Sequence, residues 1–377
     1  MSETQVIKPD RRFIRKVKAY GGDTVEKCYQ CATCSVVCEL APEDHPFPRK
    51  EMIWTQWGLR ERLMTDPDVW LCHQCSDCTV NCPRGARPGD VMAAIRRVAF
   101  EFFAFPGFMG KLLASPAGLP VLILIPLLVI GGLMMVHIGG DFNHLLSEPV
   151  EYGAFIPHGW IEMLFISGNV LIFLFAAVGL AKFYRGMLQS WDVKPKQGFN
   201  SAVIAAALDV AFHSRFSNCK TASYRKTAHM LVFFGFFGAF ATAGLALILM
   251  LIAPEQYPPI PLTNPIKWLG NASGIAIILG VVIILIQRSR DDEAAGKATY
   301  GHNLFIWMLL IVAATGMLLQ PLRIYDLREV AYATYFIHLL AVFFLLWYAP
   351  YSQFGHMFYR ALAMVFARSV GRERRTY

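Results

Sequence analysis

Six long apolar segments constrain this chain more than any other feature. Each is close to the roughly 20 residues that an α-helix needs to cross a bilayer, and all of them follow Phe108. Because lipid offers the backbone no hydrogen-bond partners, such segments span a membrane only as helices or closed barrels. The predicted spans are 119–136, 159–183, 226–252, 269–287, 303–319 and 331–357.

Composition excludes several classes of protein. Only 16% of the residues are charged and 55% are hydrophobic, whereas a soluble domain carries about a quarter charged residues. An ordinary soluble enzyme, a disordered chain and a fibrous repeat are therefore excluded. The net charge of +8 is explained by basic inner loops, so no nucleic-acid partner is predicted.

The distribution of charge along the chain predicts an orientation. The loop after the first span carries only acids, whereas the loop after the second span and the end of the chain are rich in Lys and Arg. Basic loops remain on the cytoplasmic side of a membrane. We therefore expect a multi-pass protein of the cytoplasmic (inner) membrane, with both termini in the cytoplasm.

Eight of the nine cysteines lie in two runs within the first 82 residues. Both have the C-x-x-C-x-x-C-x-x-x-C spacing of bacterial ferredoxins, in which three thiolates bind one [4Fe–4S] cluster and the fourth binds the other. Zinc is disfavoured because its sites pair C-x-x-C units from separated segments. The predicted ligands are Cys28, Cys31, Cys34 and Cys82 for cluster 1, and Cys72, Cys75, Cys78 and Cys38 for cluster 2.

The change in composition after Phe108 predicts three parts. Residues 1–110 form a cytoplasmic domain with the two clusters, 111–358 form the membrane domain, and 359–377 form a basic tail. An interfacial helix is expected near 201–213, where an apolar stretch is too short to span a bilayer. The start of the chain has no apolar core of a signal peptide, so a reducing compartment is expected for the cysteines.

Histidines in apolar segments predict a metal group inside the membrane, because ionisable residues are costly there unless they function. His229 and His356 fall near the cytoplasmic side and form one predicted haem pair. His338 and His158 form a second pair near the opposite side. A straight helix from His338 to His356, 18 residues later, would separate them by about 27 Å. Three further histidines are expected to bind no metal: His144, His213 and His302.

The fold class that follows is mainly α, with a ferredoxin-like helical domain carrying two [4Fe–4S] clusters and a six-helix transmembrane bundle with two haem b groups. No nucleotide fingerprint or catalytic triad accompanies the cysteines. The chain is therefore predicted to carry electrons between other molecules, as a subunit of an oxidoreductase. A membrane haem path implies a lipid-soluble donor, and Glu162, one turn after His158, is a candidate acceptor for its proton.

Two families share these patterns. The double cysteine run resembles the small iron–sulfur subunit of heterodisulfide reductases. The last five spans resemble the haem b membrane subunit of respiratory nitrate reductase, with the same spacing of His338 and His356 and a similar Pro350–Phe354 motif. This chain has Ala239 where those subunits have a second histidine after the glycines.

The fusion of both modules resembles the haem-containing membrane subunits of quinone-interacting membrane-bound oxidoreductases of sulfate reducers. That resemblance implies menaquinol as the substrate and Lys267 as a quinol-site residue. It also implies two soluble partners, which are heterodisulfide reductase A-like flavin and iron–sulfur subunits, and adenylylsulfate reductase as the final acceptor.

Other functions fit the same residues. The chain is alternatively the membrane subunit of a heterodisulfide reductase-like complex, or it reduces menaquinone in the opposite direction. A membrane anchor with purely structural clusters would contain no haem. A transporter is disfavoured because the sequence shows no inverted repeats with broken spans.

Overall fold

The computed structural model describes residues 8–42, 44–191, 195–213, 224–253, 259–290 and 296–372. Every regular element in these ranges is helical, which confirms the predicted mainly-α class. Six helices are long and apolar enough to cross a membrane, as predicted. They are α9 (Leu119–Ile138), α12 (His158–Ser190), α14 (Tyr224–Ile252), α15 (Pro265–Arg290), α17 (Tyr300–Ile324) and α18 (Arg328–Trp347).

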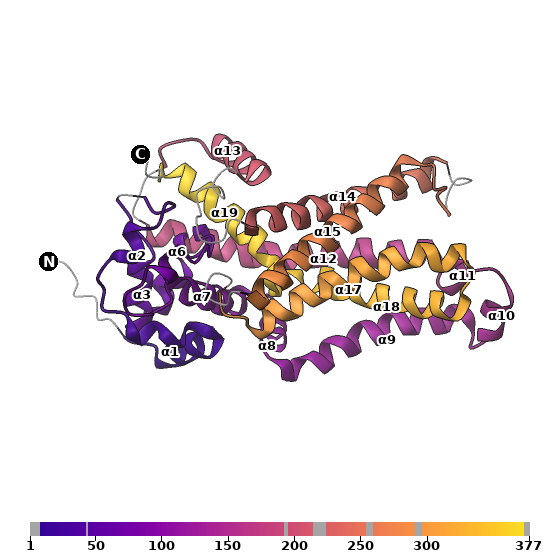
Figure 1. Cartoon of the computed structure of the whole chain (residues 1–377), viewed down its shortest axis with the longest axis horizontal. Coiled ribbons are helices and arrows are strands. Elements are labelled where there is room, and N and C mark those ends of the chain that lie inside the picture. The colour runs from indigo at the N-terminus through magenta and orange to yellow at the C-terminus, as the bar shows by residue number, and fades with distance from the viewer. Residues whose placement is uncertain are drawn as a thin grey trace.

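The long helices run side by side as one bundle, and the cysteine-containing helices cap one end of it (Figure 1). Short helices α10 (Phe142–Ser147) and α11 (Tyr152–Phe155) lie at the opposite end. The cap consists of α1 (Arg11–Val17), α2 (Thr33–Val36), α3 (Arg49–Gln56), α4 (Arg60–Met64), α5 (Asp68–Leu71), α6 (Asp77–Val80), α7 (Pro88–Phe103) and α8 (Gly107–Ala114). We call residues 8–114 the iron–sulfur module.

Two glycines of α14 allow close packing against α15. A Cβ atom on Gly238 would lie 2.2 Å from Oγ of Ser273, and one on Gly235 would lie 2.8 Å from Cγ1 of Ile277. The missing side chains therefore bring two helix backbones together, as small residues do between membrane helices.

The predicted span 331–357 is wrong at its C-terminal end. Helix α18 ends at Trp347, and two short 3₁₀ turns follow, Ala349–Tyr351 and Gln353–Gly355. Pro350 has no N–H to continue an α-helix, so the chain turns here. His356 begins a separate helix, α19 (His356–Ser369), and the separation expected from a straight helix does not apply.

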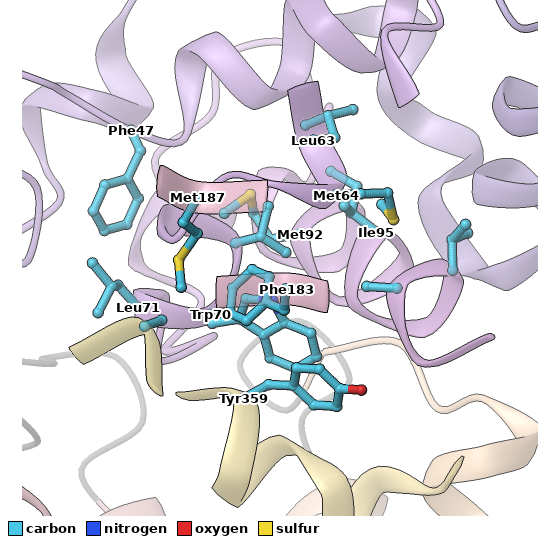
Figure 2. Close-up of a cluster of buried hydrophobic side chains, with 14 of the residues drawn as sticks. Phe47, Leu63, Met64, Trp70, Leu71, Met92, Ile95, Phe183, Met187 and Tyr359 are labelled. Carbon is cyan, nitrogen blue, oxygen red and sulfur yellow. The ribbon is translucent and has the colours of Figure 1, made fainter. Parts of the chain in front are cut away.

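Helix α19 also corrects the predicted basic tail. Its buried side chains Tyr359, Ala363 and Phe366 recur at helical spacing and join the core of the iron–sulfur module. Figure 2 shows Tyr359 together with Trp70 of α5 and Phe183 of α12, and the rings of Tyr359 and Trp70 stack with centroids 4.8 Å apart. One core thus joins the module, the end of a membrane helix and α19. Residues 373–377 lie outside the described ranges.

Helix α13 (Phe199–Phe212) covers the outside of α19. Its small residues Ala202 and Ala206 are buried in the same core, and its Asp209 pairs with Arg368 of α19 at 2.7 Å. Large apolar side chains remain on its surface, with Phe212 72% exposed. A helix is present where an interfacial one was expected, and its contact with a bilayer stays a prediction.

The packing of α19 leads to a stability test. Phe366→Ala removes a ring that is 1% exposed, which we expect to lower the free energy of unfolding by about 3–5 kcal/mol. Phe108→Ala is the control, because Phe108 is 60% exposed. The comparison is the thermal unfolding temperature of both variants in detergent. An equal effect of the two changes would show that α19 does not belong to the core.

Candidate metal centres

The two cysteine runs fold into loops of matching backbone conformation. Gln30 and Ala32 of the first run have positive φ angles, and so do their counterparts Gln74 and Ser76 in the second. Each loop then enters a one-turn helix, α2 or α6. The turns direct backbone N–H groups at sulfur: Gln30 N donates to Cys28 Sγ at 3.5 Å, and Gln74 N donates to its counterpart Cys72 at 3.3 Å. Such N–H···S bonds are a feature of iron–sulfur sites.

Cys34 lies among the thiols predicted to share its cluster. Burial raises the pKa of Cys34 to about 12, and the neighbouring thiols of Cys28, Cys31 and Cys82 contribute to that rise. A group of thiols in such a place becomes a set of thiolates only when bound metal ions offset their charge. The donor set therefore fits a metal cluster, with its fourth thiol contributed by the other run.

The second group is more deeply buried. Burial raises the pKa of Cys78, and Cys72, Cys75 and Cys38 are its strongest thiol neighbours. Cys31 of the first group is instead exposed. We call the Cys72, Cys75, Cys78 and Cys38 set the inner site, and the Cys28, Cys31, Cys34 and Cys82 set the outer site.

A cavity of about 340 Å³ lies between the inner site and the membrane bundle. Cys72 and His73 contribute to its wall on the module side, and His229 and His302 contribute from α14 and α17. His356, at the start of α19, completes the wall where the two halves meet. We call it the histidine cavity.

The predicted pair of histidines is brought together here. The ring centroids of His229 and His356 are 6.5 Å apart. Two imidazoles that face one metal at bonds of about 2 Å have centroids roughly 6 Å apart. Nδ1 of His356 lies 2.5 Å from the carbonyl oxygen of Gln353. A carbonyl only accepts, so Nδ1 carries the proton and Nε2 is left to bind metal, as in many metal sites. These residues fit a haem.

Two further histidines line the histidine cavity, although neither belongs to a predicted haem pair: His213 and His302. That they bind no metal stays a prediction. The ring of His213 lies 5.0 Å from that of His229. His213 comes at the end of α13, which its own sequence placed on the outside of the bundle. Only the packing of α13 on α19 carries it inward.

Cations surround the same cavity, and three of them reach the backbone of the inner site. Arg96 donates to the carbonyl of Cys72 at 3.1 Å, Arg360 donates to the same oxygen at 3.4 Å, and Arg225 donates to the carbonyl of Gln74. The other cationic wall residues are Arg288 and Lys297. The acidic wall residue Asp209 is already paired with Arg368. The cavity thus favours a ligand with carboxylates, such as the propionates of haem.

The two histidines of the second predicted haem pair, His338 and His158, have different neighbours. Thr315 Oγ1 donates to the carbonyl of Ile311 at 2.5 Å and lies 2.9 Å from His338 Nδ1. The hydroxyl therefore accepts from Nδ1, and Nε2 of His338 is left as a ligand atom. His158 packs its ring on Gly153 of α11 instead. The two histidines contact different helices, and their pairing stays a prediction.

The predicted quinol-site residues lie on different helices at the far end of the bundle. Lys267 is in the first turn of α15 and is half-buried, and its electrostatic neighbour is Arg323. Glu162 is in the second turn of α12.

A buried cluster of carboxylates also lies in the module, and sequence reasoning did not single it out. Glu51, Asp66 and Asp68 are close enough to bind one metal ion. However, Nζ of Lys50 lies 3.0, 2.5 and 2.6 Å from their oxygens. Arg372 adds a pair with Asp68 at 2.7 Å. The ammonium of Lys50 already occupies the place of a cation, so this is a structural ion-pair network.

Comparison with known proteins agrees with the two-part organisation. The family model of the 4Fe-4S dicluster domain matches residues 24–86, and that of citrate utilization protein B matches residues 110–377. Citrate utilization protein B of Escherichia coli is 26% identical over 317 residues, which cover 78% of this chain and 80% of that protein. No solved structure matches the chain.

The iron–sulfur module has relatives of its own. The C-type subunit of H(2):CoB-CoM heterodisulfide,ferredoxin reductase from Methanothermobacter marburgensis is 35% identical over 101 residues, which cover 27% of this chain and 52% of that relative. A heterodisulfide reductase C-like protein of Archaeoglobus profundus is 33% identical over 105 residues, which cover 28% and 56%. The chain thus spans about half the length of these relatives.

These matches confirm the predicted iron–sulfur clusters and the predicted resemblance to heterodisulfide reductase iron–sulfur subunits. The match to the membrane half covers most of the chain. The protein therefore belongs to the citrate utilization protein B family, with an iron–sulfur module of the heterodisulfide reductase C type at its N-terminal end.

Proposed function

We propose that this chain is a membrane electron-transfer subunit that connects a quinol in the bilayer to soluble redox partners. One observation carries the proposal: His229, His356 and Cys72 line the same cavity. A group held by the membrane histidines would thus be separated from the inner site by the wall of that cavity alone.

In this proposal His229 and His356 hold a haem b, whose iron supplies reversible one-electron transfer. The chain's own groups orient it. Gln353 fixes the proton of His356 on Nδ1, and the surrounding arginines offset carboxylate charge. His338 would hold the second haem, with His158 as its predicted partner, toward the far end of the bundle.

The outer site is the proposed point of exchange with soluble partners, because Cys31 is exposed. Electrons would pass from the histidine cavity to the inner site and then to the outer site. The heterodisulfide reductase-type relatives support soluble partners of the heterodisulfide reductase type. That these are two heterodisulfide reductase A-like flavin and iron–sulfur subunits rests on the resemblance of the fused chain. Both termini and the module would then lie in the cytoplasm, as the basic loops predict.

The electron donor, the complex and the final acceptor are inferred from the fusion of the two modules in one chain. We propose menaquinol as the electron donor, a quinone-interacting membrane-bound oxidoreductase as the complex, and adenylylsulfate reductase as the final acceptor. All three rest on resemblance alone. The heterodisulfide reductase relatives equally favour a membrane subunit of a heterodisulfide reductase-like complex. Flow in the opposite direction, toward menaquinone, would use the same centres.

Substitution of single cysteines tests the cluster assignment. Cys82→Ala and Cys38→Ala should each remove one cluster and so lower iron and acid-labile sulfide by about half. Because Cys82 lies with Cys34 and Cys38 lies with Cys72, the remaining cluster should differ between the two variants. Electron paramagnetic resonance of the reduced proteins distinguishes the two spectra. Cys82→Ala should leave the spectrum that Cys34→Ala leaves, and Cys38→Ala should leave that of Cys78→Ala. A match of Cys82→Ala with Cys78→Ala would contradict the exchange of the fourth ligand between runs.

Substitution of histidines tests the haem. His229→Ala and His356→Ala should each abolish the same b-type band in the reduced-minus-oxidised spectrum. His302→Ala is the matched control, since His302 lines the same cavity but belongs to neither predicted haem pair. A protein without any b-type band would instead be the alternative membrane anchor.

The arginines around the inner site lead to a prediction about its potential. The positive charge of Arg360 lies beside the Cys72 carbonyl and stabilises the reduced, more negative cluster. Arg360→Gln removes that charge. We therefore expect the midpoint potential of the inner cluster to become more negative. Arg368→Gln is the control, because it lies on the same helix but pairs with Asp209. Redox titration followed by paramagnetic resonance measures both, and equal potentials in the two variants would contradict the prediction.

A further inference from the structure

A second, smaller pocket lies beside the histidine cavity, where the iron–sulfur module meets the bundle. Its volume is about 60 Å³, which would hold roughly four to six water molecules. This is much less than a macrocycle needs. Phe305 and Gln353 line both this pocket and the histidine cavity, so a wall of about one residue separates the two.

The wall of this pocket is mainly apolar on its membrane side. Leu304 and Met308 lie one turn apart on the membrane helix α17, and Leu113 and Phe344 face them from α8 and α18. Such a surface suits an apolar chain that enters from the lipid. The polar side chains come from the module, on the opposite side of the pocket.

Arg97 of α7 is the first of these polar groups. Its guanidinium lies 5.8 Å from the ring centre of Tyr20, and α17 makes room for it at Gly301, where a Cβ would lie 2.5 Å from Nη2. Within the described ranges, the guanidinium of Arg97 donates no hydrogen bond to another protein group. Burial lowers its pKa to about 10. A guanidinium has five N–H donors, and leaving them unpaired in a partly buried place is unfavourable. An oxygen acceptor from a ligand would satisfy them.

Glu101, one turn later on α7, connects the pocket to the surface. Its carboxylate accepts from the hydroxyl of Tyr20 and, at 2.5 Å, from Nζ of Lys16. The side chain of Glu101 is 8% exposed, whereas that of Lys16 is 39% exposed. Tyr20 and Glu101 thus form a hydrogen-bonded path from the pocket, and the ammonium of Lys16, which only donates, stabilises the carboxylate at the end near water.

We propose that this pocket binds the head group of a quinone, with a ring oxygen accepting from Arg97 and the tail lying along Leu304 and Met308. The inference rests on the proposed function and gives it a site on the module side, away from Lys267 and Glu162. Oxidation of a bound quinol would release two electrons, one at a time, toward the groups held beyond Phe305 and Gln353. Its two protons would pass by way of the Tyr20 hydroxyl to the carboxylate of Glu101 and from there to water.

Binding of a quinone analogue to the purified, haem-loaded chain tests this site. The probe is a fluorescent alkyl-hydroxyquinoline N-oxide, whose emission is quenched when it binds near haem. Arg97→Leu should weaken its binding by about tenfold, since a hydrogen bond to a charged donor is lost. Arg15→Leu is the matched control and should leave binding unchanged, because Arg15 is exposed on α1 and does not line the pocket. Lys267→Leu tests the alternative site at the far end of the bundle. The haem and cluster spectra of all three variants establish that the protein is intact.

Each result has a distinct meaning. Undiminished binding in Arg97→Leu overturns the pocket, and loss of binding in Lys267→Leu alone moves the site to the far end. If Arg97→Leu loses only a co-purified anionic phospholipid, measured by mass spectrometry, the pocket binds lipid and the proposal is wrong. A separate measurement, reduction of the haem by a short-chain naphthoquinol in the unaltered chain, tests the proposed function itself.

Glu101→Gln tests the proton route separately. The amide keeps the shape of the side chain but cannot take up a proton, so the analogue should bind normally while haem reduction by naphthoquinol slows. Glu61→Gln of α4 is the matched control, because the Glu61 side chain is 71% exposed and does not line the pocket. An unchanged rate in Glu101→Gln contradicts the proton route.

Discussion

The apolar face of α19 is the contact on which the rest of the arrangement depends. Tyr359 and Phe366 fill the core of the iron–sulfur module, and burial of aromatic side chains of this size is among the largest favourable terms in a fold. Because the helix begins at His356, the same packing places that histidine at the boundary between module and bundle. One turn later, Arg360 reaches the backbone of the inner site. Helix α19 therefore contributes core side chains of the module, a candidate haem ligand and a positive charge beside the inner site.

The junction also concentrates positive charge where negative groups would bind. Arginines from α7, α14 and α19 donate to carbonyls of one short segment, residues 71–74. Burial alone would disfavour a reduced cluster, because its added negative charge is poorly solvated. Nearby guanidinium groups oppose that effect and stay charged at any physiological pH. The inner site is thus buried but has positive charges beside it. The outer site differs, because its Cys31 is exposed.

Helix α7 has two functional sides in this scheme. Arg96 contributes to the histidine cavity and the inner site, while its neighbour Arg97 and the following turn with Glu101 face the smaller pocket. Adjacent residues of a helix point about 100° apart, so residues of one turn of α7 line both the histidine cavity and the smaller pocket. The proposed quinone pocket, the histidine cavity and the inner site then lie in sequence around one helix.

The sequence alone determined the local chemistry. The spacing of eight cysteines predicted the clusters, and the lengths of apolar segments predicted six spans, because ligand geometry and membrane thickness each act over short stretches of chain. Tertiary structure decided which distant residues meet. His213 and His302 enter the histidine cavity, the last span stops at Trp347, and the expected tail becomes a buried helix. These outcomes depend on the packing of α13, α17 and α19 on surfaces far away in the chain, which no local pattern specifies.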